Sequence, residues 1–141
     1  MAAPKSPRPR PRAKAGSANP ARGEHTLTLA GTTYVMRPTY DAIVAIEDAL
    51  DLTALELARA GAEGRLGCNV LGVIVAELVR AGAAPDDRLT ANVTADALAR
   101  LIYEEGRAKV GTVITVVLSG AVMGGHKATG EPKAVTEMPT G

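Results

Sequence analysis

Two short runs of alternating hydrophobic and polar residues stand near the start of the patterned part of the chain. The first run occupies residues 25–29 and the second residues 33–37, and both contain residues that favour strands. In the first run Leu27 and Leu29 point one way, and in the second Tyr34 and Met36 share one face. Gly31 lies between the runs and suits a tight turn, because glycine accepts a positive φ. The pattern predicts a β-hairpin that ends at Pro38, which has no backbone N–H to donate.

After Pro38 the hydrophobic residues recur at the three- and four-residue spacing of a helix. The predicted core-facing residues of this helix are Tyr40, Ile43, Ile46 and Leu50. Thr39 suits the N-cap position, since its hydroxyl can accept a hydrogen bond from the first turn. Thr53 suits the N-cap of a second, shorter helix, whose apolar residues are Leu55, Leu57 and Ala58. We expect the three glycines Gly61, Gly64 and Gly67 to break the chain after it.

The most apolar predicted helix covers residues 70–80. Its main stripe consists of Leu71, Ile74, Val75 and Leu78, and further valines widen the stripe. A helix that is apolar on most sides lies in a core or against another subunit. We interpret residues 82–89 as a loop. A further helix is predicted to begin at Thr94 and to end or kink at Gly106, with Ala97, Leu98, Leu101 and Ile102 facing inward.

Residues 107–123 fit two structures. Their β-branched residues favour a strand, but Val110, Val113, Ile114, Val117 and Leu118 also form a helical stripe. The length favours a helix, because strands usually have about five or six residues. Residues 110–126 carry no Asp, Glu, Lys or Arg, which raises the question of a membrane span. This window is at the short limit of about 17 residues and contains several glycines and hydroxyl side chains, so a buried helix is favoured.

These patterns predict one α+β domain with a two-stranded hairpin packed on a bundle of four to five α-helices. The hairpin needs the helices, because two strands alone are not stable in water. We assign residues 1–22 to a disordered Pro/Arg-rich tail, residues 23–124 to the domain and residues 125–141 to a flexible C-terminal tail. With 2% aromatic residues, the core must be built from Val, Leu, Ile and Ala.

The charge is balanced overall but uneven along the chain. The formal net charge is +1, yet the first acid, Glu24, follows six basic residues: Lys5, Arg8, Arg10, Arg12, Lys14 and Arg22. Such a tail could neutralise phosphates, which leaves a nucleic-acid-binding module as an alternative function. The tail contains no aromatic residue for base stacking, so we favour a solvated extension and expect no nucleic-acid partner.

The residue types that carry chemistry are few and scattered. The two histidines, His25 and His126, lie at opposite ends of the folded region, and neither has a helical partner at metal-ligand spacing. Cys68 is the single cysteine, which excludes an internal disulfide and a multi-Cys zinc site. It precedes an apolar helix, whose dipole could activate a thiol, but no base is evident nearby, so we interpret it as a buried small residue.

The remaining candidates also lack a complete motif. Gly61, Gly64 and Gly67 do not match the dinucleotide-binding pattern, and no phosphate loop of the Walker type is present. Asp86-Asp87 lacks the alternating acids of a calcium loop. Glu104-Glu105 stands near the C-terminal end of a predicted helix and is typical of a solvated face. We therefore predict no catalytic, cofactor or metal site, and no enzyme.

A family resemblance is carried mainly by residues 23–47. It consists of Gly-Glu at 23–24, a Leu-x-Leu strand, the Gly31 turn, a Tyr-Val-Met-Arg-Pro strand end at 34–38, and a helix carrying Ile46-Glu47. This order and spacing resembles a group of small tail proteins of tailed phages and of gene transfer agents. The later order of helices is similar as well, so the resemblance covers roughly residues 18–123.

The resemblance implies a role in tail morphogenesis, as a tail assembly chaperone or as a tail tube component. A tube subunit needs a sizeable sheet that closes with its neighbours, whereas this chain predicts one hairpin and surplus apolar helix faces at 71–79 and 110–118. We favour a chaperone that binds the tape-measure protein in the cytoplasm of the bacterial host. Association with the particle and a homo-oligomer stay open. We expect no membrane partner and no cofactor.

Overall fold

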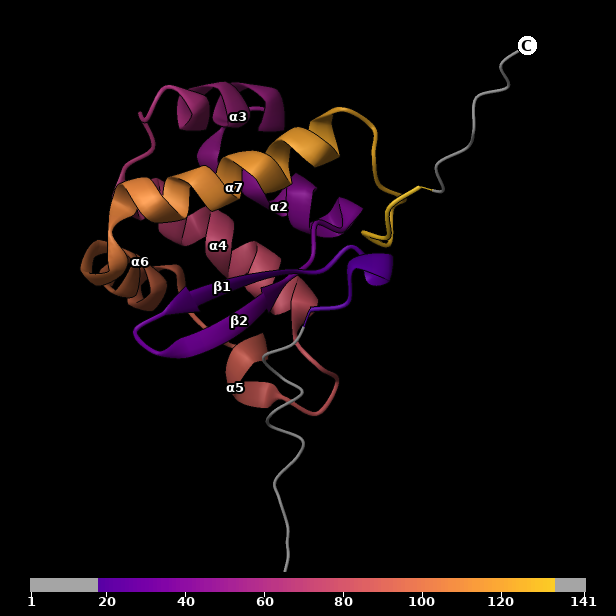
Figure 1. The fold of residues 1–141 in the computed structure, drawn as a ribbon, viewed down its shortest axis with the longest axis horizontal. Helices are drawn as coiled ribbons and strands as arrows, with labels where there is room; N and C mark the ends of the chain where they lie inside the picture. The colour runs from indigo at the N-terminus through magenta and orange to yellow at the C-terminus, as the bar shows by residue number, and fades with distance from the viewer. Residues whose placement is uncertain (1–17, 134–141) are drawn as a thin grey trace, which may run out of the picture.

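The computed structural model describes residues 18–133, in which a β-hairpin packs against a group of helices (Figure 1). The elements in chain order are the 3₁₀ helix η1 (Pro20–Arg22), the strands β1 (His25–Leu29) and β2 (Thr32–Met36), and the helices α2 (Tyr40–Leu50), α3 (Ala54–Ala62), α4 (Cys68–Gly82), α5 (Arg88–Ala91), α6 (Ala95–Glu105) and α7 (Arg107–Val122). The predicted architecture of a hairpin on a helical bundle is thus confirmed.

The hairpin is joined by a two-residue turn. Ala30 and Gly31 both have positive φ, 50° and 83°, as the turn that matches the strand twist requires. The antiparallel register pairs Leu29 with Thr32 and Leu27 with Tyr34. Leu27, Leu29 and Met36 are buried, so the face predicted to be apolar is the one that meets the helices.

Threonine side chains begin three of the helices, as the sequence predicts. The hydroxyl of Thr39 accepts a hydrogen bond from the Ala42 N–H at 3.0 Å, and that of Thr94 accepts one from the Ala97 N–H at 3.1 Å. Thr53 forms a full capping box with Glu56, in which each side chain accepts a hydrogen bond from the other residue's backbone N–H.

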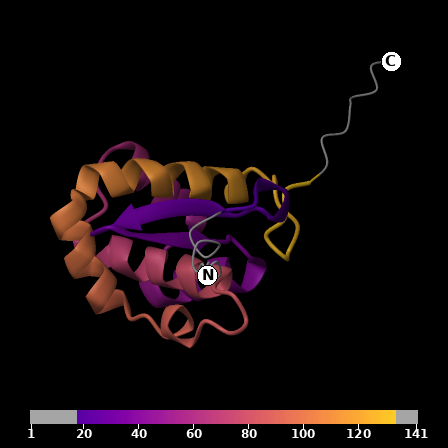
Figure 2. The ribbon, with the colours of Figure 1, turned by 60° about the horizontal axis from the view of Figure 1, so that its bottom comes forward.

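Helix α4 lies at the centre and contacts α2, α6, α7 and β2. The predicted stripe Leu71, Ile74, Val75 and Leu78 is completely buried. Glycines allow the closest approaches: a Cβ at Gly72 would lie 2.6 Å from the carbonyl oxygen of Ala95 in α6, and one at Gly82 would overlap the carbonyl oxygen of Val35 in β2. Figure 2 shows the hairpin between α7 and α4. The core therefore has helices on both sides of the strands.

Residues 107–122 form a helix and not a strand. Val110, Ile114, Val117 and Leu118 are buried along one side of α7, as the helical stripe predicts. Gly106, with a φ of 114°, joins α6 directly to α7. Helix α3 packs closely on α7, because Gly61 leaves room for the side chain of Thr115. Within residues 18–133 no helix is long and apolar enough to cross a membrane.

Several local predictions need correction. The helical spacing predicts Tyr40 in the core, but Tyr40 is the first residue of α2 and is 64% exposed. Ala97 is exposed, and Ala99 takes the buried position in α6. Residues 82–89 do not form one loop: α4 continues through Gly82, and the short helix α5 starts at Arg88 with Asp87 as its N-cap. Gly61 lies inside α3 and does not end it.

Two glycine-to-alanine substitutions test the role of the close approach at α4. Gly72→Ala should lower the free energy of unfolding by about 1–3 kcal/mol, since the new methyl group would also lie 2.9 Å from the Cβ of Ala99. Gly111→Ala in α7 is the matched control, because a Cβ there meets nothing within 4 Å. It should raise stability by about 0.5–1 kcal/mol through helix propensity. Urea unfolding followed by circular dichroism gives both values, and equal effects would contradict the packing described.

Candidate functional site

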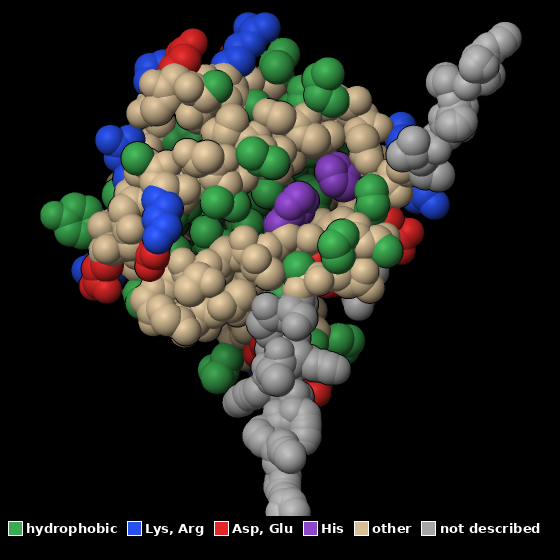
Figure 3. All heavy atoms as spheres, viewed as in Figure 1, with side chains coloured by type: hydrophobic (Ala, Val, Ile, Leu, Met, Phe, Trp, Pro, Cys, Tyr) green, Lys and Arg blue, Asp and Glu red, His purple; other side chains and the backbone are tan. Residues whose placement is uncertain are grey.

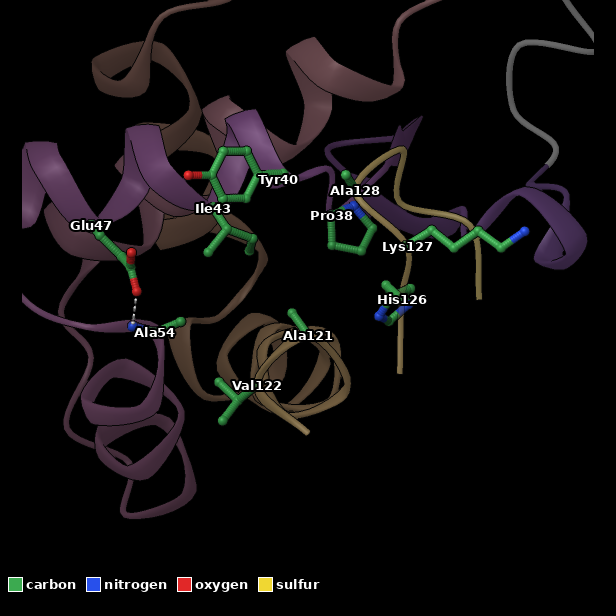
Figure 4. A pocket seen from close by; sticks show the side chains of 10 residues that line it. All are labelled: Pro38, Tyr40, Ile43, Glu47, Ala54, Ala121, Val122, His126, Lys127 and Ala128. Carbon is green, nitrogen blue, oxygen red and sulfur yellow. Dashed lines mark hydrogen bonds between the residues drawn. The ribbon is translucent and has the colours of Figure 1, made fainter. Parts of the chain in front are cut away.

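A pocket of about 350 Å³ lies where α2, the start of α3, the end of α7 and the segment after Gly124 meet (Figure 4). Its lining residues are Pro38, Tyr40, Ile43, Glu47, Ala54, Ala121, Val122, His126, Lys127 and Ala128. Most of these side chains are apolar. Glu47, His126 and Lys127 are the polar exceptions.

The segment after Gly124 builds one wall of this pocket. Its Ala128 carbonyl accepts a hydrogen bond from the Tyr40 N–H at 2.8 Å, and His126 forms an isolated β-bridge with Pro132. Gly130 lies against Gly23, where any Cβ would overlap the Gly130 carbonyl. We predict a flexible tail from residue 125 onward. In the structure two bonds join the start of this segment to the domain, from the Tyr40 N–H to the Ala128 carbonyl and from the Gly125 N–H to the Gly120 carbonyl. The sequence did not reveal this, because backbone hydrogen bonds leave no hydrophobic pattern. Residues 134–141 lie outside the described part.

The charged groups at the pocket serve mainly structural roles. Glu47 accepts a hydrogen bond from the Ala54 N–H at 2.8 Å and so helps to hold the start of α3 (Figure 4). The side chain of Lys127 extends away from the pocket in the same view. Arg37 lies behind Pro38, and its guanidinium is 3.9 Å from the carboxylate of Glu131. Glu47 and His126 both line the pocket, and the carboxylate of Glu47 is engaged by the Ala54 N–H.

The two histidines, far apart in sequence, are neighbours in the fold. The ring centroids of His25 and His126 lie 6.4 Å apart with the planes tilted by 59°, and Figure 3 shows them side by side. They meet because His25 starts β1 and His126 belongs to the segment that folds back beside it. Nδ1 of His126 is buried and has no hydrogen-bond partner among the described residues. Burial, and then the charge of His126, lower the pKa of His25.

The other predicted candidates stay separate from this pair. Within the described residues no group of three or more His, Cys, Asp or Glu side chains could hold a metal ion. Cys68 is the first residue of α4 and is only partly buried, which differs from the buried residue we expected. It lies in a shallow depression with the exposed Tyr103 and Glu104 of α6, and no histidine lines that depression. The ionisable residues that line it with Cys68 are Asp96, Arg100, Tyr103 and Glu104.

In each of the acidic pairs Asp86-Asp87 and Glu104-Glu105, one carboxylate accepts hydrogen bonds within the fold. Asp87 accepts a hydrogen bond from the Thr90 N–H and begins α5. Glu105 accepts hydrogen bonds from the Lys109 ammonium at 2.8 Å and from the Ala30 N–H at 3.2 Å. These bonds lower the pKa of Glu105, with Lys109 as the larger cause. The interpretation of Glu104-Glu105 as a solvated face thus holds only for the exposed Glu104, since Glu105 also fixes the hairpin turn.

The apolar helix faces that suggested a binding surface are used inside the protein. Val75 and Val79 of α4, and Ile114 and Leu118 of α7, are all buried in the core. Val116 is the member of these stretches that is largely exposed, and the other exposed large hydrophobic side chains are Tyr40, Leu52, Leu55, Leu89, Tyr103 and Met123. The sequence could not separate buried from exposed hydrophobic residues on these helices. A helix that is apolar on several sides has the same sequence pattern whichever of its sides are buried by neighbouring elements.

Comparison with known proteins identifies the family. A family model described as phage tail tube protein, GTA-gp10, matches residues 22–124, about three quarters of the chain. The chain belongs to this family of phage tail proteins. Neither the curated proteins nor the solved structures searched gave a significant match. The GTA-gp10 family is a non-enzymatic tail assembly family, which confirms the resemblance seen in residues 23–47 and agrees with the scattered polar residues of the fold.

The histidine pair predicts a pH-dependent stability. Because the folded state lowers the pKa of His25 below its usual value of about 6.5, the unfolded chain binds more protons just below that pH. Stability should be complete above pH 7 and should fall as the pH drops through 6.5 toward 5.5. Thermal unfolding of the GTA-gp10 protein at pH 7.5 and 5.5 measures this difference.

The variant His25→Gln should show a smaller difference in Tm between the two pH values. Thr28→Gln, at an exposed position on the same strand, is the control and should behave like the wild type. An unchanged pH dependence in His25→Gln would contradict the assignment to this residue.

Proposed function

We propose that this GTA-gp10 family protein is a tail assembly chaperone that binds the tape-measure protein. One observation carries the proposal: in residues 18–133 the only sheet has two strands, β1 and β2. A tube subunit needs several strands that join those of its neighbours into a closed barrel. The other described secondary structure is helical, and its apolar faces fill the protein's own core.

The surface supports binding to another protein. Two large hydrophobic side chains beside the pocket are exposed to solvent. They are Tyr40, which is 64% exposed, and Met123, which is 81% exposed. Exposed aromatic and methionine side chains are enriched where proteins bind one another. We propose that the domain at residues 23–124, with the packed segment that follows it, carries this activity, and that residues 1–22 are an extension that the activity does not need.

A structural tube component is the second candidate, and the exposed edge of β1 favours it. The pair Leu29 and Thr32 closes the two-residue turn, so Thr26 and Thr28 direct their backbone groups away from β2. Among the described residues these groups have no backbone hydrogen-bond partner. An unpaired strand edge can accept a strand from a neighbouring subunit. The edge of β2 is different, because α4 covers it.

The proposed chaperone acts in the cytoplasm of the bacterial host and leaves before the particle is complete. It should therefore co-purify with the tape-measure protein of the same particle when the two are co-expressed. Quantitative mass spectrometry of finished particles should detect far less than one copy per tube subunit. Stoichiometric copies in the particle would support the tube component instead, and no co-purification would contradict the chaperone.

A truncated protein separates the domain from its tail. Deletion of residues 1–17, which lie outside the described structure, should leave co-purification with the tape-measure protein unchanged. Loss of co-purification after this deletion would show that the basic tail takes part in binding. In that case the binding should also weaken steeply with added salt, because charged contacts are screened.

A further inference from the structure

Residues 125–133 close on themselves and form a small loop, which we call the 125–133 loop. Its internal contacts are the hydrogen bonds from the Lys127 N–H to the Glu131 carbonyl and from the Lys133 N–H to the Gly125 carbonyl, and the β-bridge between His126 and Pro132. The loop is joined to α7 through Gly124, whose φ of 75° is one that glycine adopts without strain. A loop with its own hydrogen bonds on a glycine joint can move as one body.

Few contacts fasten the 125–133 loop to the domain. Beyond residue 125, one backbone hydrogen bond joins it to the rest of the described structure, from the Tyr40 N–H to the Ala128 carbonyl at 2.8 Å. The carboxylate of Glu131 lies 3.9 Å from the guanidinium of Arg37, which is too far for a hydrogen bond. Gly130 is the loop residue that is buried. A segment with so little apolar burial is of the kind that opens locally.

The two histidines form a further contact between the loop and the domain. The ring of His126 packs on α7 at Gly120, where a Cβ would lie 3.1 Å from its Cε1 atom. Its other neighbour is His25 at the start of β1, and the two ring centroids are 6.4 Å apart (Figure 3). A neutral pair can pack in this way, whereas two protonated rings repel each other. Protonation therefore weakens the contact that holds the loop.

The burial of His126 adds to this effect. Its Nδ1 atom is buried and has no hydrogen-bond partner among the described residues. A neutral imidazole carries one N–H, but an imidazolium carries two and needs an acceptor for each. Water supplies that acceptor when the loop opens. Burial, followed by the charge of His126, also lowers the pKa of His25, so the open form takes up protons more readily than the closed form.

The other ionisable groups around the pair do not offset its charge. The charged side chains on the surrounding elements are Glu24, Arg37, Glu47, Lys127, Glu131 and Lys133. Three of these are acids and three are cations, and residues 110–122 of α7 add only Tyr-free, Lys109-free sequence with no charge. Each acid has a contact of its own, with the Asn19 N–H, the Ala54 N–H and the Arg37 guanidinium respectively. The phenol of Tyr40, which lines the pocket with His126, is neutral in this pH range.

We propose that the 125–133 loop is an acid-sensitive lid, with Gly124 as its hinge and the pair of His25 and His126 as its latch. The loop contributes three of the ten residues that line the pocket, so its release widens the pocket (Figure 4). It also uncovers Pro38, which is buried in the closed form. Opening should increase as the pH falls below about 6.5, where a free histidine takes up a proton. The lid does not depend on whether the protein is a chaperone or a tube component.

Hydrogen exchange at the Tyr40 N–H reports the state of the lid in the full-length protein, because its acceptor is Ala128 of the loop. NMR gives the protection factor at pH 7.5 and at pH 5.5, each corrected for the intrinsic exchange rate at that pH. Protection at Tyr40 should fall about 3-fold or more at pH 5.5, since one titrating group changes an equilibrium by at most about 10-fold per pH unit.

The Ala30 N–H is the matched control within the same molecule. It also donates to another element, the carboxylate of Glu105, and it lies at the opposite end of β1 from His25. The pKa of Glu105 is lowered, chiefly by its hydrogen bond with Lys109, so this contact stays ionised at both pH values. Protection at Ala30 should therefore be the same at pH 7.5 and pH 5.5.

Three variants assign the response to the latch. His25→Gln and His126→Gln should each reduce the pH dependence at Tyr40, because a neutral side chain removes the repulsion between two charged rings. Lys127→Gln is the control on the loop itself, since its side chain extends away from the pocket, and it should respond like the wild type (Figure 4). Circular dichroism checks that each variant folds, and the comparison of the wild type at two pH values needs no variant.

The outcomes separate the lid from a general loosening of the domain. Constant protection at Tyr40 in the wild type would overturn the lid. Equal losses at Tyr40 and Ala30 would also overturn it, because the whole domain would then open in acid. A full response in both histidine variants would show that the pair is not the latch. Co-purification with the tape-measure protein is a separate measurement, so the lid and the proposed function can fail independently.

Discussion

The close packing around α4 is the constraint on which the rest of the structure depends. This helix touches α2, α6, α7 and β2, and its buried leucines, isoleucine and valines are each worth about 1.5–3 kcal/mol when removed from water. The contacts require backbones to come near each other, which is possible at Gly72 and Gly82 because neither carries a Cβ. A hairpin of two strands is not stable alone, so β1 and β2 exist as ordered strands because α4 and α7 cover them.

The position of the pocket follows from this packing. Helix α2 lies on α4 through Ala42 and Ile46, which turns Tyr40 and Ile43 toward the end of α7. The segment after Gly124 then closes the remaining side through its bond to the Tyr40 N–H. The pocket is thus a space left at the border of the core, with apolar walls taken from three helices. That origin explains why most of its lining side chains are apolar.

Membership of the GTA-gp10 family and the geometry lead to the same kind of role. A tail protein has to recognise other proteins. In this domain most of the large hydrophobic side chains are buried in its own core. The large hydrophobic side chains that remain exposed in the described structure include Tyr40 and Met123 near the pocket and Leu89, Tyr103 and Val116 elsewhere.

The sequence by itself determined the local elements. Alternation predicted the strands, and threonines predicted the starts of α2, α3 and α6, because these signals act between residues near in sequence. The length of the run at 107–123 favoured a helix over a strand, and the structure has a helix at Arg107–Val122. The family was also accessible from residues 23–47. Only the tertiary structure decided that Tyr40 is exposed, that the apolar stripes of α4 and α7 are buried, that His25 meets His126, and that residues 126–128 line the pocket. These features depend on contacts between segments up to a hundred residues apart, and no local pattern encodes which segments will meet.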